Sequence, residues 1–201
     1  MKLYFSPGAC SLSPHIVLRE LGLPFELERV DTKAQKTASG ADFTAINPKK
    51  YVPTLQLDGG EVLTEGAVIV QYLADRKPDA QLAPPAGSME RYRLQEWLNY
   101  IASEIHKSYS PLFRAAEEQR PPLRDAMAAK FEYLAGHLQS RPFLLGERFS
   151  VADAYLFTVL NWSKRVGIDL ARWPSLHSYV QRIAARPAVR TAMETEGLLR
   201  T

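Results

Sequence analysis

The stretch KLYFSPGACSLSPHIVLRELG, residues 2–22, decides how the chain begins to fold. A short β-like run over 2–5 meets a turn containing proline and glycine, and a helical pattern follows from Ser11 to Gly22. Cys10 lies at the start of that helix, where unpaired N–H groups and the helix dipole favour an anion. The pKa of a cysteine there can fall well below its free value of about 8.5. The position therefore predicts a site that stabilises a thiolate, either that of Cys10 or one carried by a ligand.

The next sixty residues continue the mixed pattern. FELERV (25–30) is a second β-like run, and TLQLDGGEVLT (54–64) alternates apolar and polar residues on both sides of an Asp-Gly-Gly turn, which predicts a hairpin. EGAVIVQYLADR (65–76) has a broad apolar helical face. The predicted order is β-α-β, an unassigned stretch, and then β-β-α.

A linker separates this part from an all-helical one. KPDAQLAPPAGS (77–88) contains three prolines and a glycine, a composition that breaks both periodicities. Beyond it, apolar residues recur at helical spacing to the end of the chain. We therefore predict one domain over 1–78, a linker over 79–88 and a helical domain over 89–201.

The helical domain carries one clear helix start. Ser150 is followed three residues later by Asp153, a capping-box arrangement, and the following residues are almost uniformly apolar. This pattern predicts a buried helix beginning near Val151. Further helices are expected over Pro122–Gln139 and from Pro174 to just before Pro187.

Composition excludes several classes of function. Apolar residues make up 46% of the 201 residues, enough to bury a core. The net charge of +3 is spread over both halves without the basic stripe typical of nucleic-acid binding. One cysteine and four dispersed histidines suggest neither an internal disulfide nor a metal site. Without a signal-peptide pattern or a membrane-spanning apolar run, the expected location is the cytoplasm, away from membranes.

Five motifs in order resemble the bacterial beta class of the glutathione transferases, over essentially the whole chain. They are SPGACSLSPHIVLRE (6–20), YVPTLQLD (51–58), LTEGAVIVQYLAD (63–75), SEIHKSYSPLF (103–113) and FSVADAYLF (149–157). The resemblance implies a thioredoxin-like βαβ-ββα domain (α/β) followed by an all-α domain that lines the electrophile site. It also implies a homodimer that uses glutathione as co-substrate and needs no metal.

Three side chains near the first helix compete to activate the glutathione thiol. The resemblance ranks Cys10 first and adds His106 from the helical domain, with Ser11 as a rival and Tyr4 as a packing residue of the first strand. Cys10 could donate a hydrogen bond to the glutathione thiolate or form a mixed disulfide with it, and the sequence leaves both open. A lone histidine facing a core is, in general, more often structural than catalytic.

The resemblance also assigns the residues that bind the tripeptide. Pro53 is expected to be cis, so that the main chain of Val52 pairs with the cysteinyl part of glutathione. Glu65 and Gly66 begin a helix whose free N–H groups and carboxylate suit the γ-glutamyl zwitterion. The chain departs from the class in having Gln35 followed by Lys36 where two lysines are common, so Lys33 or Lys36 would meet the glycine carboxylate.

Three polar residues interrupt the first helix of the helical domain. Asn99, Ser103 and His106 follow at intervals of four and three, which places them on one α-helical face. By resemblance, His106 overlooks the glutathione sulfur while Asn99 and Ser103 reach the partner's site. Tyr109, Leu112 and Phe113 are candidates for the wall that meets the apolar electrophile, and the three tryptophans are assigned to packing.

The predicted function is therefore detoxification, by transfer of alkyl or aryl groups to the glutathione sulfur. One alternative is thiol–disulfide exchange or reductive dehalogenation through Cys10. A second is a ligand-binding member of the fold without enzyme activity, against which the retained thiol-site residues argue.

Overall fold

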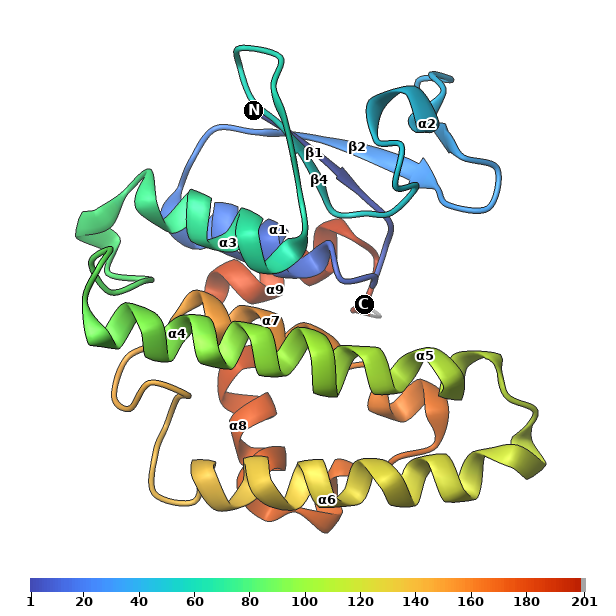
Figure 1. Cartoon of the computed structure of the whole chain (residues 1–201), viewed down its shortest axis with the longest axis vertical. Coiled ribbons are helices and arrows are strands. Elements are labelled where there is room, and N and C mark those ends of the chain that lie inside the picture. Colours follow the sequence, from blue (N-terminus) through green and yellow to red (C-terminus); the bar gives the residue numbers. More distant parts are fainter. Residues whose placement is uncertain (200–201) are drawn as a thin grey trace. The chain divides into compact units, whose positions relative to one another are not determined.

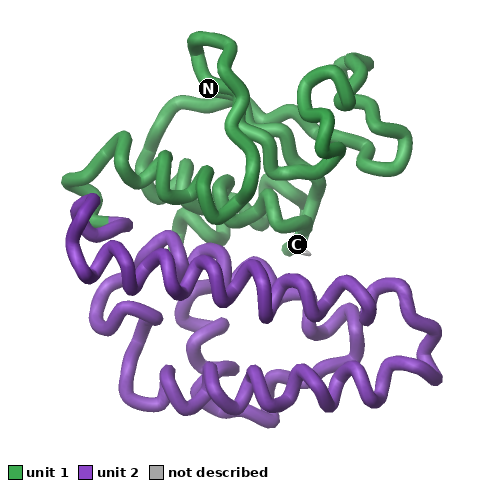
Figure 2. Tube along the Cα trace, in the orientation of Figure 1, with its two compact units in different colours: residues 1–81, 186–201 green, residues 82–185 purple. Residues whose placement is uncertain are grey.

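The computed structural model describes residues 1–199, which form two compact units (Figures 1 and 2). The first unit contains residues 1–81 together with the segment that begins at Arg186, and the helical unit contains residues 82–185. The boundary at Gln81 falls within the predicted linker. The sequence analysis assigned everything beyond 88 to the helical domain, and the structure differs for the last segment.

The first unit is built on a five-stranded sheet (Figure 1). Its strands lie in the order β3-β2-β1-β4-β5, with β1 and β2 parallel and the other neighbours antiparallel. A parallel pair requires a crossover, and helix α1 supplies it. The predicted hairpin is the pair β4–β5, with Leu55 opposite Leu63. The strands are β1 (Lys2–Phe5), β2 (Glu26–Asp31), β3 (Lys36–Thr37), β4 (Thr54–Gln56) and β5 (Val62–Thr64).

Helices α1 (Leu12–Leu21) and α3 (Gly66–Asp75) lie together on one face of this sheet (Figure 1). The residues from Leu12 to Leu18 are all buried, because α1 also packs against α9 (Pro187–Thr195). The stretch left unassigned from the sequence contains β3 and α2 (Phe43–Ile46), with Phe43 packed on the ring of Tyr4.

The C-terminal segment belongs to the first unit for a clear physical reason. Arg186 donates two hydrogen bonds to the Glu20 carboxylate, at 2.6 and 3.0 Å, and α9 buries Val189 and Ala192. A short amphipathic helix near the end of a helical domain looks like one more helix of that domain. The prediction had only local periodicity to use, and periodicity does not say which surface a helix covers.

The helical unit contains a long helix that runs beside α6 (Figure 1). This long helix is α4 (Met89–Tyr100) and α5 (Lys107–Arg114), joined by a π-helical segment, Ile101–His106. The sequence predicted one continuous α-helix here. The other helices of this unit are α6 (Arg120–Leu138), α7 (Val151–Leu160) and α8 (Pro174–Ala184), and its 3₁₀ turns occupy Glu117–Gln119, Ser163–Val166 and Leu170–Arg172. A further 3₁₀ turn, Pro78–Ala80, lies in the first unit.

Helix α7 is the core of the helical unit, as its apolar sequence predicts. Every residue from Val151 to Leu160 is buried. The predicted capping box is confirmed: the Asp153 carboxylate accepts hydrogen bonds from the N–H and the hydroxyl of Ser150, both at 2.8 Å. The same carboxylate also accepts from the N–H of Leu144 at 2.9 Å and the hydroxyl of Tyr179 at 3.0 Å. Across residues 1–199, no helix combines the length and apolarity needed to span a bilayer.

Candidate active site

Cys10 lies in the loop between β1 and α1, one residue before the helix cap. The loop turns at Gly8, whose positive φ of 69° favours glycine. The Cys10 thiol donates a hydrogen bond of 3.2 Å to the main-chain carbonyl of Val52, in the loop that precedes β4. The sequence-distant loops around residues 10 and 52 thus meet at the end of the sheet.

The surroundings of Cys10 keep it protonated. Desolvation raises the pKa of its thiol to about 12, and the charge of Glu65 adds to this increase. The N–H groups of Cys10 and Ser11 lower the pKa, as expected at a helix start, but burial has the larger effect. The expectation that this position lowers the pKa of Cys10 itself is therefore corrected. In the protein without ligand, Cys10 is a neutral hydrogen-bond donor at physiological pH.

A neutral Cys10 should react slowly with alkylating agents. Because only the thiolate is nucleophilic, we expect iodoacetamide at pH 8 to modify Cys10 at least about a hundredfold more slowly than free cysteine. The rate should continue to rise with pH beyond pH 10. The urea-unfolded protein, followed by intact mass, is the control and should react at the ordinary rate. Equal rates for folded and unfolded protein would contradict the raised pKa.

The same raised pKa makes folding stability depend on pH. Above the ordinary thiol value of 9.0, the unfolded chain releases a proton that the folded protein retains up to about pH 12. Because the folded state then binds more protons, this contribution to the free energy of unfolding falls as pH rises through that window. The Cys10→Ala variant should lack this pH-dependent contribution. The difference in the free energy of unfolding between the variant and its parent should therefore change between pH 9 and pH 12.

The hydroxyl of Ser11, the rival candidate for thiol activation, is engaged inside the Cys10 loop. Its side chain is fully buried, and its hydroxyl accepts from the N–H of Ser6 at 3.1 Å and donates to the carbonyl of Ser6 at 3.2 Å. Both bonds close the loop before α1, so the hydroxyl is already used. Tyr4 is also internal, with its hydroxyl donating to Gln56 at 3.0 Å, as the packing assignment predicts.

The Val52–Pro53 peptide bond is cis, as the sequence resemblance implies. Gly66, the first residue of α3, lies against Pro53: a Cβ built on Gly66 would be 3.5 Å from the proline Cγ. Cys10, Val52, Pro53 and Gly66 are therefore neighbours in the first unit. They come from three separate loops of the sheet, and the structure brings these predicted residues together.

Glu65 caps α3 with a positive φ of 68° and extends an exposed carboxylate. Lys49 donates to this carboxylate at 2.7 Å and to the hydroxyl of Thr64 at 3.0 Å. Sequence reasoning did not single out Lys49, although the lysine pair at 49–50, just before the Val-Pro segment, was a visible signal. The result is one carboxylate and one ammonium side by side at the edge of the site.

Gln35 and Lys36 lie at the turn into β3. Gln35 has a positive φ of 56°, and its amide nitrogen donates to the carbonyls of Thr32 and Lys50, at 2.6 and 3.3 Å. Its amide oxygen is buried and has no hydrogen-bond partner among the described residues. Lys36 is exposed. The region thus offers an unused acceptor and an exposed cation.

A buried polar cluster behind the Cys10 loop was missed by the sequence analysis. The Glu196 carboxylate, just beyond α9, accepts from the N–H of Gly8 at 2.8 Å and meets Nδ1 of His15 at 2.8 Å. Arg19 donates to Nε2 of His15 at 3.3 Å, so Nδ1 carries the hydrogen given to Glu196. The C-cap residue of α9 thereby holds the loop that carries Cys10. No local sequence pattern links Glu196 to Gly8.

His106 ends the π-helical segment of the helical unit. Its Nδ1 is 2.7 Å from the hydroxyl of Tyr155, and its ring lies edge-on to Trp162 with centroids 4.8 Å apart. Burial lowers the pKa of His106 to about 4, with a smaller effect from Lys107, so the ring is neutral at pH 7. Trp162 is buried as predicted, but its contact with His106 was not foreseen.

The expected common face of Asn99, Ser103 and His106 depended on α-helical spacing, which the π segment interrupts. Asn99 and Ser103 are exposed, whereas His106 is half-buried among aromatic rings. The three candidates for the apolar wall also differ in their exposure. Tyr109 and Leu112 are fully buried, and only Phe113 presents a substantial apolar surface. Tyr109 donates to or accepts from Ser163 at 2.6 Å inside the core.

Both units match known families. Residues 8–76 match the model of the glutathione S-transferase N-terminal domain, and residues 97–187 match that of the C-terminal domain. The chain belongs to the glutathione S-transferase family. Glutathione S-transferase GstA of Escherichia coli O157:H7 is 48% identical over 200 residues, which cover 98% of this chain and 100% of the relative.

Solved glutathione S-transferases agree with this assignment. The bacterial beta-class enzyme of Sphingomonas chungbukensis is 46% identical with a TM-score of 0.95, covering 99% of this chain and 100% of its own. A sphingomonad glutathione S-transferase complexed with glutathione is 46% identical with a TM-score of 0.94, with the same coverage. The predicted beta class, glutathione conjugation and glutathione as co-substrate are confirmed. The described residues contain no cluster of three or more potential metal ligands.

Proposed function

We propose that Cys10 activates glutathione as a hydrogen-bond donor and not as a nucleophile. The observation that carries this proposal is the Cys10 thiol itself, protonated and already donating to the carbonyl of Val52. A thiol that donates to a carbonyl can turn to donate to an incoming sulfur anion, which is the better acceptor. The N–H groups at the start of α1 add to the stabilisation of that anion.

Hydrogen bonds to the charged form lower the pKa of the bound glutathione thiol, so that the thiol releases its proton to solvent water. The thiolate then attacks an electrophilic carbon, so that a sulfur–carbon bond forms and the leaving group departs with the bonding electrons. Cys10 keeps its own proton throughout. This separates Cys10 from the sulfur that reacts, and only the glutathione sulfur enters the product.

The charges around the Cys10 loop fit the two ends of the tripeptide. Glu65 suits the α-amino group of the γ-glutamyl moiety, and Lys49 suits its carboxylate. The main chain of Val52 would pair with the cysteinyl part, and Lys36 would meet the glycine carboxylate. The unused amide oxygen of Gln35 is an acceptor for a peptide N–H of the ligand.

In the helical unit, we assign His106 to the glutathione sulfur and Phe113 to the apolar electrophile. A neutral His106 whose Nδ1 is engaged with Tyr155 has Nε2 left as its second polar atom. The homodimer, the reach of Asn99 and Ser103 to the partner's site, and the cytoplasmic location stay predictions. They agree with what is typical of the family.

Thiol–disulfide exchange through Cys10 is not favoured. Exchange requires the thiolate, and a pKa of about 12 leaves very little of it at neutral pH. A role without enzyme activity is not favoured either, because relatives across the whole chain are glutathione S-transferases.

The test compares Cys10→Ala with its parent on immobilised glutathione, in conjugation of an activated aryl chloride and in a disulfide-exchange assay. Losing one hydrogen bond to a charged group should reduce conjugation about tenfold, while binding persists. Ser11→Ala should lower thermal stability more than it lowers kcat. Intact mass should show no reducible glutathione adduct. A stoichiometric adduct on Cys10, together with exchange activity that Cys10→Ala abolishes, would favour the nucleophilic alternative.

A further inference from the structure

The π-helical segment Ile101–His106 is not explained by its own residues. It contains neither glycine nor proline, and most of its residues are compatible with an ordinary α-helix. Pro111 lies further along, inside α5. A proline has no N–H and its ring crowds the carbonyl four residues earlier, which here is that of Lys107. That crowding lies inside α5, after the wide turn, so it does not account for the π-helical geometry of Ile101–His106. Turns of this kind occur frequently at functional sites.

The widening decides which way His106 faces. A π turn holds an additional residue, so each inserted residue rotates the subsequent part of the helix by about 100° relative to an α-helix. Ser103 in the middle of the segment is exposed, whereas the His106 ring meets Tyr155 and Trp162 of the core. The position of the His106 ring therefore depends on the segment Ile101–His106 remaining π-helical.

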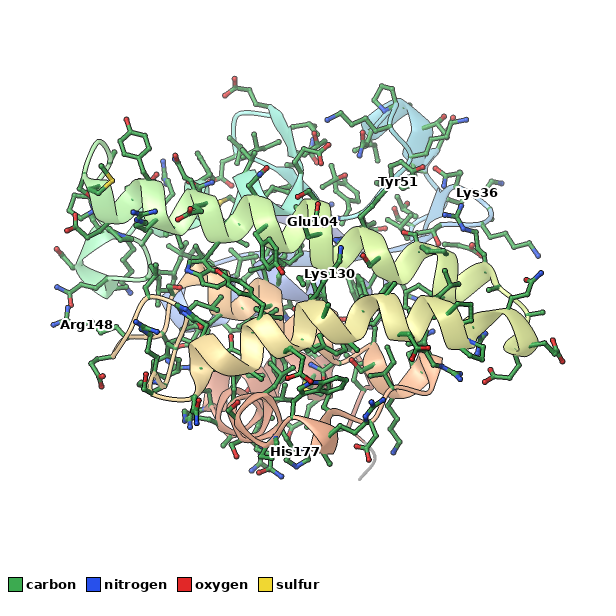
Figure 3. All side chains as sticks on the ribbon, turned by 60° about the horizontal axis from the view of Figure 1, so that its bottom comes forward. Lys36, Tyr51, Glu104, Lys130, Arg148 and His177 are labelled. Carbon is green, nitrogen blue, oxygen red and sulfur yellow. The ribbon has the colours of Figure 1, made fainter. Side chains whose placement is uncertain are left out.

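Lys130 of α6 holds the segment near its C-terminal end. Its ammonium donates to the main-chain carbonyl of Glu104 at 3.0 Å, to the Glu104 carboxylate at 2.7 Å and to the hydroxyl of Ser108 at 3.0 Å. Ser108 in turn donates to the same carbonyl at 2.6 Å. Figure 3 shows Glu104 and Lys130 between the two helices. One carbonyl of the π segment thus receives two side-chain donors, which compete with the regular helical pairing.

We propose that Lys130 is a positioning residue for His106, because its ammonium keeps Ile101–His106 π-helical and the imidazole against Tyr155 and Trp162. The catalytic consequence rests on the function proposed above for His106. Lys130 touches neither His106 nor a reacting atom, so it acts through Glu104 and Ser108. Its side chain retains 25% exposure, and an isolated ion pair of this kind contributes little to global stability. Removal of the Lys130 ammonium should therefore change the position of the His106 ring more than it changes the global stability of the protein.

The titration of His106 reports its position directly. Tyr155 of α7 and Lys107 of α5 are the titratable groups that face or act on the ring, and Trp162 covers it. Burial is the main reason that its pKa is about 4. A ring released from Tyr155 and Trp162 into water would titrate closer to the ordinary value of about 6.5.

The experiment uses the full-length protein with isotope-labelled histidines, and His106→Asn identifies the His106 signal. Lys130→Met keeps the aliphatic stem and removes the charge, and Lys130→Arg restores a cation. Lys164→Met is the matched control, because Lys164 is exposed and its side chain has no ion pair among the described residues. Titration by NMR, thermal unfolding, and kcat and KM for glutathione with an activated aryl chloride are measured for each variant.

Lys130→Met should raise the His106 midpoint by about one pH unit or more. It should lower kcat about tenfold and leave KM for glutathione within about twofold, since misplacement of a catalytic group mainly affects the reacting geometry. Lys130→Arg and Lys164→Met should stay within about twofold of the parent in both parameters.

An unchanged His106 titration in folded Lys130→Met would overturn the proposal, whatever happens to kcat. Should Lys130→Met fail to fold, Ser108→Ala tests the same contact by removing one partner of Lys130 and one donor to Glu104. If His106→Asn retains full kcat, the catalytic role of His106 fails. A shifted His106 titration in Lys130→Met would still support the positioning role in that case, so the two failures are distinguishable.

Discussion

Replacement of Asp153 by alanine is expected to destabilise the helical unit by about 3–5 kcal/mol, because several buried donors lose their acceptor together. The carboxylate has no solvent exposure and accepts from Leu144, from Ser150 twice and from Tyr179. It joins the start of α7 to the preceding loop and to α8. Its removal therefore affects three segments of the core at once.

Urea unfolding followed by circular dichroism measures this effect. Asp169→Ala is the matched control, because Asp169 also caps a helical turn by accepting from the N–H of Ala171, but on the exposed surface. That loss should cost about 1 kcal/mol. Asp153→Asn keeps one acceptor oxygen, so its loss in the free energy of unfolding should lie between those of Asp153→Ala and Asp169→Ala. A similar small loss for Asp153→Ala and Asp169→Ala would show that the buried carboxylate is not the centre of this network.

Glu196→Ala is the second substitution with a large expected effect, here on the first unit. It removes the acceptor of two hydrogen bonds, from Gly8 N–H and from Nδ1 of His15, and the side chains of His15 and Glu196 have no exposure. We expect a loss of about 2–4 kcal/mol in the free energy of unfolding. The Cys10 loop should also become mobile, which should raise KM for glutathione.

Hydrogen exchange of the Gly8 amide distinguishes mobility of the Cys10 loop from loss of global stability. In Glu196→Ala, exchange at Gly8 should become faster under conditions where the core amides stay protected. Glu194→Ala, in the last turn of α9, is the control, since Glu194 is exposed and its side chain is unpaired within residues 1–199. Glu196→Gln should retain part of the stability through its amide oxygen. Unchanged exchange at Gly8 in Glu196→Ala would mean that the loop does not depend on the C-terminal segment.

Local patterns predicted the elements of the fold well. The strand–turn–helix opening, the hairpin at 54–64 and the capping box at Ser150 each depend on residues that are close in sequence. The set of residues around Cys10 was predicted from the family resemblance rather than from local patterns. Cys10, Val52 and Gly66 meet because the order of elements in this fold brings their loops to the same end of the sheet.

The remaining features depend on contacts between distant residues. The pKa of Cys10 is raised because burial outweighs the helix start, and burial is not visible from sequence neighbours. The hydroxyl of Ser11 is used by Ser6, which the type of residue alone does not reveal. The π segment is contacted by Lys130, which is contributed by another helix and lies 26 residues beyond Glu104 in the sequence.

The discontinuous first unit has a consequence for synthesis on the ribosome. Its sheet and α1 are translated first, yet Glu196 and α9, which complete the packing of α1, are translated only after the whole helical unit. In the nascent first unit, the surface of α1 that packs against α9 therefore stays uncovered while the residues of the other unit, about a hundred, are synthesised. Chaperones that recognise exposed apolar segments can bind during that interval, which ends when α9 packs against α1.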